Sequence, residues 1–138
     1  MTTGAIIFAQ NNTNIDYVKM AVFCASRIKK YLDIPISIIT DSSDWLSSAY
    51  PDHCFDKIIN IPRGNYKQTK QYRDGALSAK ILDWRNQSRS MIYNLTPYDR
   101  TLVLDSDYIV SSALLKSALD NDHEFQIYKK SFPLAPDV

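Results

Sequence analysis

The sequence predicts an α/β fold with an open, mainly parallel, Rossmann-like sheet flanked by helices. Continuous apolar runs at 4–9 (GAIIFA), 36–40 (ISIIT) and 101–104 (TLVL) are typical of strands buried on both faces. An amphipathic helical pattern separates the first two runs, and strands alternating with helices favour this architecture. The 138 residues match one ordinary domain, so a single domain over 1–138 is expected.

The first 62 residues predict the order strand, helix, strand, helix, strand. After the strand at 4–9, Thr13 or Asn14 is expected to cap a helix that holds Asp16 in its first turn. Pro35 ends that helix, and a second strand follows at 36–40. A loop around a short helix and a third strand at 56–62 come next. The apolar stripe of the first helix consists of Val18, Ala21, Val22, Ala25, Ile28 and Leu32.

The second half of the chain is expected to begin with a polar, basic loop at 63–75. A second long helix should follow and end before Pro97. A fourth strand at 100–107, a short capped helix at 111–119 and a further strand at 124–130 complete the predicted order. The stripe that predicts the second helix consists of Leu77, Ile81, Trp84, Met91, Ile92 and Leu95.

Composition excludes several classes of protein. The formal charge of +1, from 16 basic and 15 acidic side chains, does not indicate binding to nucleic acid or to an anionic membrane surface. Two cysteines without ligand-like spacing exclude a cysteine-based zinc site and argue against a disulfide scaffold. The N-terminal residues lack a signal-peptide pattern, and no apolar run approaches the roughly 20 residues that span a bilayer. A cytoplasmic protein is the expectation.

The fourth predicted strand ends in two acids one residue apart, Asp105 and Asp107. In a regular strand, both side chains would point to one face, where like charges repel. A hard divalent cation removes that repulsion, because Mg²⁺ and Mn²⁺ accept carboxylate oxygens and bridge to phosphates. Ligands of open α/β sheets bind beyond the carboxyl ends of the strands, where these acids are expected. A solvated, charged strand end is the structural alternative.

The segment RSMIYNLTPYDRTLVLDSDYIV (Arg89–Val110) resembles GT-A-fold glycosyltransferases, most nearly the glycogenin-like and galactinol-synthase-like group. The opening IIFAQNNTNIDYVKMAVFCASRIKKY and the run ISIITD are similar to the first strand and helix and the second strand of that family. The resemblance implies metal-dependent transfer from a nucleotide-diphospho-sugar, with retention at the anomeric carbon. A UDP-sugar is the favoured donor, and the acceptor is unknown.

The resemblance implies a metal site at Asp105 and Asp107 that holds Mn²⁺ or Mg²⁺, with Ser106 among the nucleotide-binding residues. Arg89 matches a basic residue that faces the diphosphate, and a guanidinium binds phosphate oxygens in a bidentate manner. Lys80 matches a second basic position. A solvated helix face is the structural alternative for both basic residues.

The loop after the first strand matches the part of the family that holds the nucleotide base. Phe8, Gln10 and Asn11 are expected to offer backbone and amide groups to the base edge, and Tyr17 to stack on its ring. Asp41 is expected to accept hydrogen bonds from the base or ribose. Tyr17 as a helix aromatic covering the core and Asp41 as a cap of the next helix are the structural alternatives.

The family continues past the acidic motif into an acceptor-binding half, which this sequence is expected to lack. The chain therefore resembles the donor-binding part alone, and an exposed sheet edge or apolar face makes a homodimer an expectation. A nucleotidyltransferase is a rival function, although FAQNNTNID has neither glycine nor lysine for a phosphate loop. A non-catalytic nucleotide-binding or assembly domain is the other rival.

Overall fold

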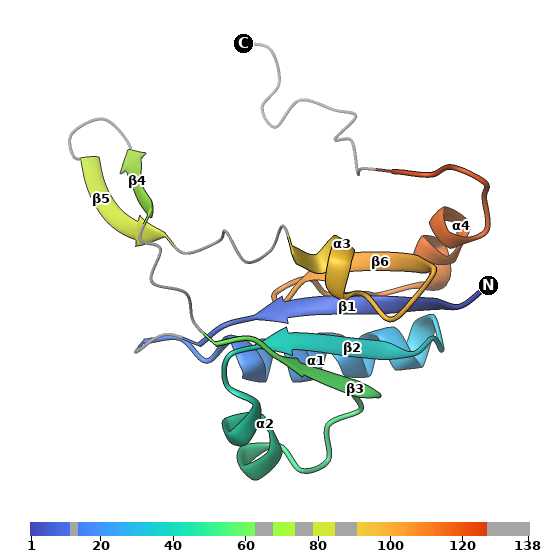
Figure 1. Cartoon of the computed structure of the whole chain (residues 1–138), viewed down its shortest axis with the longest axis horizontal. Coiled ribbons are helices and arrows are strands. Elements are labelled where there is room, and N and C mark those ends of the chain that lie inside the picture. The colour runs from blue at the N-terminus through green and yellow to red at the C-terminus, as the bar shows by residue number, and fades with distance from the viewer. Residues whose placement is uncertain (12–13, 63–67, 74–78, 85–90, 127–138) are drawn as a thin grey trace.

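A four-stranded, all-parallel sheet forms the centre of the protein (Figure 1). The structure is a computed structural model that describes residues 1–11, 14–62, 68–73, 79–84 and 91–126. The predicted α/β class, with an open Rossmann-like sheet flanked by helices, is confirmed. In sheet order the strands are β3 (Lys57–Asn60), β2 (Ile36–Thr40), β1 (Thr3–Ala9) and β6 (Arg100–Asp105).

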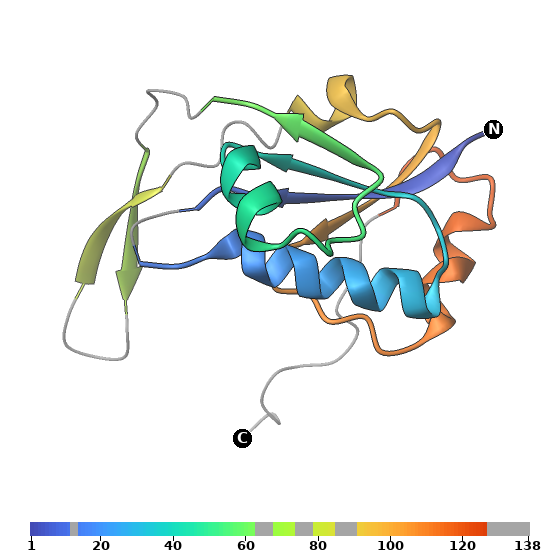
Figure 2. The ribbon, with the colours of Figure 1, turned by 90° about the horizontal axis from the view of Figure 1, so that it is seen from below.

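Helices lie on both faces of this sheet. Figure 2 shows α1 (Tyr17–Tyr31) on one side of the sheet and α3 (Ile92–Leu95) on the other. The helix α2 (Ser43–Ala49) contributes Leu46 to the core on the α1 side. The capped helix predicted at 111–119 is a 3₁₀ turn, η2 (Ala113–Leu115), followed by α4 (Lys116–Leu119), and the Ser112 side chain accepts a hydrogen bond from Leu114 N.

The central strands are buried on both faces, which explains their continuous apolar sequences. One face of β1 packs against α1, and the other packs against α3 and its flanking residues. Because side chains alternate along a strand, neighbouring residues of β1 enter different cores. The α1-side core includes Ala5, Ile7, Ala9, Val18, Ile28 and Leu104, and the α3-side core consists of Ile6, Phe8, Ile39 and Ile92.

A separate antiparallel pair replaces part of the predicted loop and helix. β4 (Gln68–Arg73) pairs with β5 (Ala79–Trp84), so the loop expected at 63–75 is wrong at 68–73, and the helix expected over 77–95 is wrong at 79–84. The spacing of Ile81 and Trp84 suited a helix, but these residues take part in an antiparallel ladder. Of the described residues in that predicted helix, Met91–Leu95 are helical, as a one-residue 3₁₀ start followed by α3.

Other predicted strands also differ in their bounds. The third, expected at 56–62, spans Lys57–Asn60. The fourth strand stops at Asp105, and residues 106–107 form a turn instead of continuing it. In the strand expected at 124–130, the described residues 124–126 are not in a strand, and the remainder lies outside the described residues.

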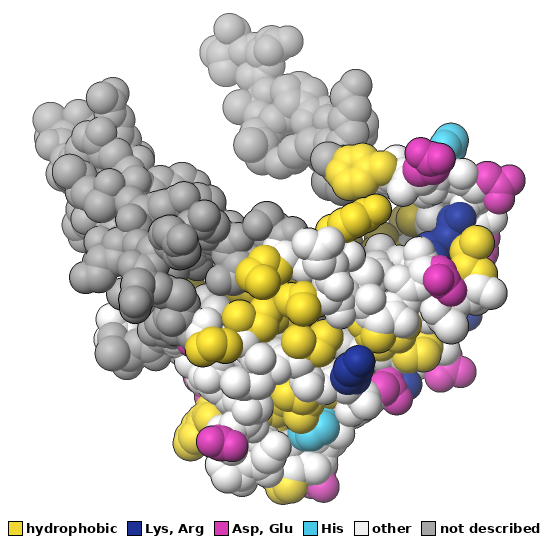
Figure 3. Space-filling view, viewed as in Figure 1, with side chains coloured by type: hydrophobic (Ala, Val, Ile, Leu, Met, Phe, Trp, Pro, Cys, Tyr) yellow, Lys and Arg dark blue, Asp and Glu magenta, His cyan; other side chains and the backbone are white. Residues whose placement is uncertain are grey.

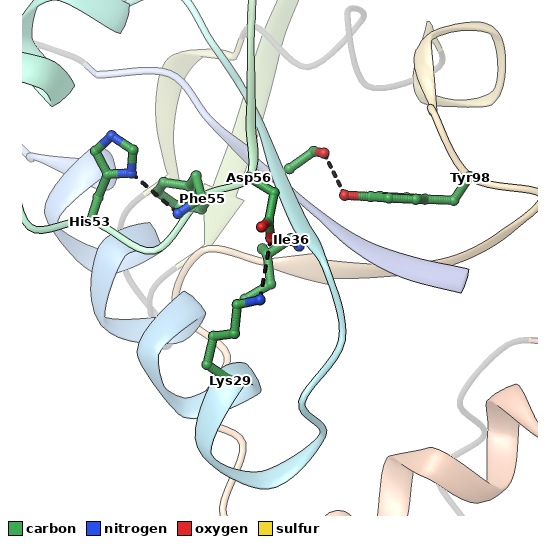
Figure 4. Close-up of polar contacts among 7 residues, drawn as sticks. Lys29, Ile36, His53, Phe55, Asp56 and Tyr98 are labelled. Carbon is green, nitrogen blue, oxygen red and sulfur yellow. Dashed lines mark hydrogen bonds and ion pairs between the residues drawn. The ribbon is translucent and has the colours of Figure 1, made fainter. Parts of the chain in front are cut away.

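Polar contacts fasten the amino ends of the strands (Figure 4). Asp56 accepts a hydrogen bond from Ile36 N at 2.8 Å and pairs with Lys29 Nζ at 3.3 Å. The Ile36 amide is the main reason that the pKa of Asp56 lies below its usual value. On the opposite side of the sheet, the Tyr98 hydroxyl lies 2.7 Å from the Ser37 hydroxyl. These contacts hold the amino ends, opposite the edge where ligands of α/β sheets bind.

Several apolar side chains are exposed on the face that carries α3. Met91 and Tyr93 at α3 and Val103 in β6 are exposed by 45, 88 and 52%. Figure 3 shows apolar side chains gathered on the described part of this face. This exposure agrees with the reasoning behind a homodimer, which stays a prediction.

No helix in the described ranges has both the length and the apolar character to cross a membrane.

Candidate functional site at the switch point of the sheet

The strand order creates a switch point between β1 and β6. From β1 the chain adds β2 and then β3 on one side, whereas β6 pairs with the opposite side of β1. Phe8 is paired with Asp105 in the parallel register, so the two strands reach the same edge together. Open α/β sheets bind ligands in the crevice at such a point, beyond the carboxyl ends of the strands. The predicted metal and base-binding segments therefore meet there, although they are almost a hundred residues apart.

The carboxyl end of β6 is a tight turn. Tyr108 N donates to Asp105 O at 3.1 Å, which closes a turn over Asp105, Ser106 and Asp107. The carboxylate-bearing residues Asp105 and Asp107 are exposed, whereas Ser106 is buried. The expectation that both acids point to one face assumed a regular strand through Asp107. Because β6 ends at Asp105, the relative orientation of the two carboxylates is set by the turn and not by strand alternation.

Cys24 of α1 lies beneath this turn. Its Sγ contacts Asp105 O at 3.9 Å, and burial, with the negative charge of Asp107 as the smaller cause, raises the thiol pKa to about 11. The thiol therefore stays protonated at neutral pH and packs as a small apolar group. Cys24 thus packs directly against the backbone of the acidic turn.

The carboxyl end of β1 brings Phe8 and Gln10 to the same edge. The Phe8 side chain is 5% exposed and belongs to the α3-side core, and the expected contact of its backbone with the base stays a prediction. Gln10 Nε2 is buried and has no hydrogen-bond partner among the described residues. A buried amide donor without an acceptor costs about 1–3 kcal/mol, and such groups in folded proteins call for an explanation.

Asn11 and Asp16 together begin α1. Asp16 is the N-cap and accepts from Lys19 N at 3.0 Å; the cap is therefore not Asn14, and Thr13 lies outside the described residues. Asn11 Oδ1 accepts from Val18 N, and Asn11 Nδ2 donates to Asp16 Oδ1, each at 3.0 Å. Both the oxygen and the nitrogen of the Asn11 side chain are therefore hydrogen-bonded to the start of α1. This side chain has a structural role at the edge of the sheet.

Asp16 also ties this loop to α2. Its Oδ2 accepts from Trp45 Nε1 at 3.0 Å and from the Tyr50 hydroxyl at 2.7 Å. Burial acts to raise the pKa of Asp16, but the hydrogen bonds from Tyr50, Lys19 N, Trp45 and Asn11 outweigh it and keep the pKa below its usual value. The same carboxylate raises the pKa of Tyr50. Sequence reasoning missed this group, because no local signal connects Trp45 with Asp16.

Of the other four residues expected to bind the nucleotide, the structure describes three, and they lie in different parts of the fold. Tyr17 is partly buried and packs against the α1-side core, in agreement with its structural alternative. Asp41 follows β2 at the same edge of the sheet and accepts from the Ser42 hydroxyl at 2.8 Å. Lys80 lies on β5 instead of a helix face, and Arg89 lies outside the described residues. The structure thus brings Gln10, Asn11 and Asp41 to the edge that carries the acidic turn.

Comparison of the chain with family models, curated proteins and solved structures found no match. Within the described ranges, no three His, Cys, Asp or Glu side chains form a group that could hold a metal ion.

Proposed function

We propose that the chain binds a nucleotide-diphospho-sugar at the switch point, as a metal-dependent, retaining glycosyltransferase or as the donor-binding part of one. One observation carries the proposal: the turn with Asp105 and Asp107 and the loop with Gln10 and Asn11 share the carboxyl edge of β1 and β6. The resemblance of Arg89–Val110 to GT-A-fold enzymes supplies the chemistry. A UDP-sugar is the proposed donor, and Mn²⁺ or Mg²⁺ the proposed ion.

The acidic turn has a suitable donor set for such an ion. Its two carboxylates are exposed and lie within three residues of each other. Mg²⁺ in nucleotide sites is usually held by only one or two carboxylates together with substrate phosphates and water, so a third protein ligand is not required. The bound ion would offset charge on the leaving diphosphate. In this proposal Asp105 and Asp107 hold the ion beside the strand ends.

The loop after β1 would orient the nucleoside. Gln10 has a buried amide donor that lacks a partner among the described residues, and a small change of its side chain would present that donor to a ligand oxygen. The Asn11 side chain is bonded to Asp16 and to Val18 N at the start of α1, so ligand binding would not have to order this side chain. Asp41 lies at the end of the neighbouring strand, where it could accept a hydrogen bond from ribose or base.

Thermal unfolding with UDP tests the proposal. At a ligand concentration a hundredfold above the Kd, binding stabilises the native state by about 2.7 kcal/mol, or roughly 5–10 °C for a domain of this size. We expect this shift to require Mn²⁺ and to be lost in Asp105→Asn and Asp107→Asn. Asp122→Asn is the matched control, because Asp122 is exposed in the segment that packs near the opposite end of β6.

Other outcomes would favour the rival functions. A metal-dependent shift with nucleoside triphosphates but none with UDP would favour a nucleotidyltransferase. No response to any nucleotide, with or without metal, would contradict the proposal and favour a non-catalytic assembly domain. A UDP response that persists without metal and in both aspartate variants would place the ligand away from the acidic turn.

A further inference from the structure

Trp45 is a half-exposed aromatic residue whose ring is nevertheless fixed. Its side chain is 49% exposed. The indole N–H donates to Asp16 Oδ2 at 3.0 Å, and the ring meets Tyr50 edge to face, with centroids 6.3 Å apart and planes at 90°. An indole held at its polar edge and along one side keeps a defined orientation while part of its surface remains open to a ligand.

The position of Trp45 links it to the switch point. One oxygen of Asp16 binds the indole, and the other binds Asn11 in the loop that leaves β1. A single carboxylate therefore separates the Trp45 ring from that loop. Figures 1 and 2 both show α2 beside the first turn of α1, at the end of the sheet to which β1 and β2 run.

An aromatic residue of α1 lies near the same loop but packs towards the core. Tyr17, in the first turn of α1, packs against the core below the helix. Its ring therefore supports the sheet, whereas the Trp45 ring presents surface to solvent beside the same loop. A planar ligand group bound next to Asn11 would find its aromatic partner in α2 and not in α1.

We propose that the exposed surface of the Trp45 indole stacks on the base of the bound nucleoside diphosphate. This inference depends on the proposed function, since it assigns one part of that ligand. Stacking on an aromatic ring tolerates every base, because each has a π-face. Trp45 would therefore supply affinity for UDP, GDP and CDP alike, and hydrogen-bonding groups elsewhere in the loop would have to select among them.

Titration calorimetry with two ligands separates this inference from the proposed function. UDP and inorganic pyrophosphate, each with MnCl₂, share the metal and diphosphate contacts, but only UDP carries a base. Removal of a stacking ring costs roughly five- to 150-fold in affinity. We expect Trp45→Ala to weaken UDP by a factor in this range and to leave pyrophosphate binding unchanged.

Two further variants separate stacking from the hydrogen bonds of Asp16. Tyr50→Phe removes one hydrogen bond to Asp16, as Trp45→Ala does, but it leaves the indole in place. It should leave UDP affinity within about twofold, and Trp45→Phe should retain most of it because a ring remains. In a Trp84→Phe background, where Trp45 is the only tryptophan, UDP should quench the fluorescence and pyrophosphate should not.

The outcomes are distinguishable. If the native protein binds UDP and pyrophosphate but Trp45→Ala binds both unchanged, the stacking role is wrong and the proposed function stands. Equal weakening of UDP by Tyr50→Phe and Trp45→Ala would mean that the hydrogen bonds of Asp16, and not the ring, carry the effect. If the native protein binds neither ligand, both proposals are wrong.

Discussion

Substitution of Asp16 by Asn tests the group of contacts that joins β1, α1 and α2. The carboxylate accepts hydrogen bonds from Asn11, Lys19 N, Trp45 and Tyr50. An amide keeps one oxygen, which suffices for the Lys19 cap, and Asn is itself a good N-cap residue. Its NH₂ group would then face the Trp45 N–H, where two donors meet, while the Tyr50 hydroxyl can rotate and accept.

The expected loss of stability follows from the number of hydrogen bonds that Asp16 accepts. Of the four hydrogen bonds to the carboxylate, the one from Trp45 disappears and the other three lose their charged partner. A hydrogen bond to a charged group contributes about 1.5–3 kcal/mol when it is well buried. Because Asp16 is only partly buried, screening reduces these contributions, so we expect Asp16→Asn to cost about 1–2 kcal/mol. Asp16→Ala also loses the cap, about 1 kcal/mol more, together with the Asn11 anchor. It should cost about 2–4 kcal/mol.

Urea unfolding as a function of pH measures this effect. A carboxyl whose folded pKa lies below its unfolded value of about 3.9 contributes stability that is present above that value and is lost as the pH falls through the folded pKa. The difference in free energy of unfolding between the native protein and Asp16→Asn should therefore be constant from about pH 5 to 7 and become smaller below about pH 4. Asp52→Asn, at an exposed turn position, should stay within about 0.5 kcal/mol. If Asp16→Asn and Asp52→Asn have the same free energy of unfolding at pH 7, the contacts of Asp16 do not stabilise the fold.

Three further predictions concern the packing around the sheet. Gly4→Ala would place a Cβ 2.5 Å from the Tyr98 ring and should destabilise the protein by about 1–3 kcal/mol in urea unfolding; an unchanged midpoint would mean that the ring moves freely. Tyr98→Phe should cost about 1–3 kcal/mol in the same assay, because it leaves the buried Ser37 hydroxyl without its partner. At pH 8, alkylation of Cys24, whose pKa is about 11, should be at least about a hundredfold slower than in the unfolded chain by peptide mass spectrometry, and equal rates would contradict its burial beside Asp107.

Much of the fold could be predicted because its central strands are buried on both faces. Such strands appear in the sequence as continuous apolar runs, and the run at Ile36–Thr40 was placed with its observed bounds. The long helix over 77–95 failed because its stripe was judged by side-chain spacing alone. The partner of Ala79–Trp84 is Gln68–Arg73, a polar segment that carries little strand signal of its own.

The candidate site could be predicted only in pieces. The sequence places Asp105 at the end of one predicted strand and Gln10 directly after another, since the end of an apolar run is visible in the sequence. Their meeting at one edge depends on β6 pairing with β1, and no local pattern gives the order of strands in a sheet. The contact of Trp45 with Asp16 depends in the same way on where α2 packs against α1, so it became visible only in the structure.

The central claim is that Asp105 and Asp107 share one divalent ion with a diphosphate at the end of β6. Anomalous diffraction from crystals grown with MnCl₂ and UDP tests it most directly. We expect a manganese peak within coordination distance, about 2.0–2.6 Å, of oxygens from the acidic turn and from the diphosphate. A UDP molecule bound elsewhere, or carboxylates in the turn with no manganese peak beside them, would contradict the account.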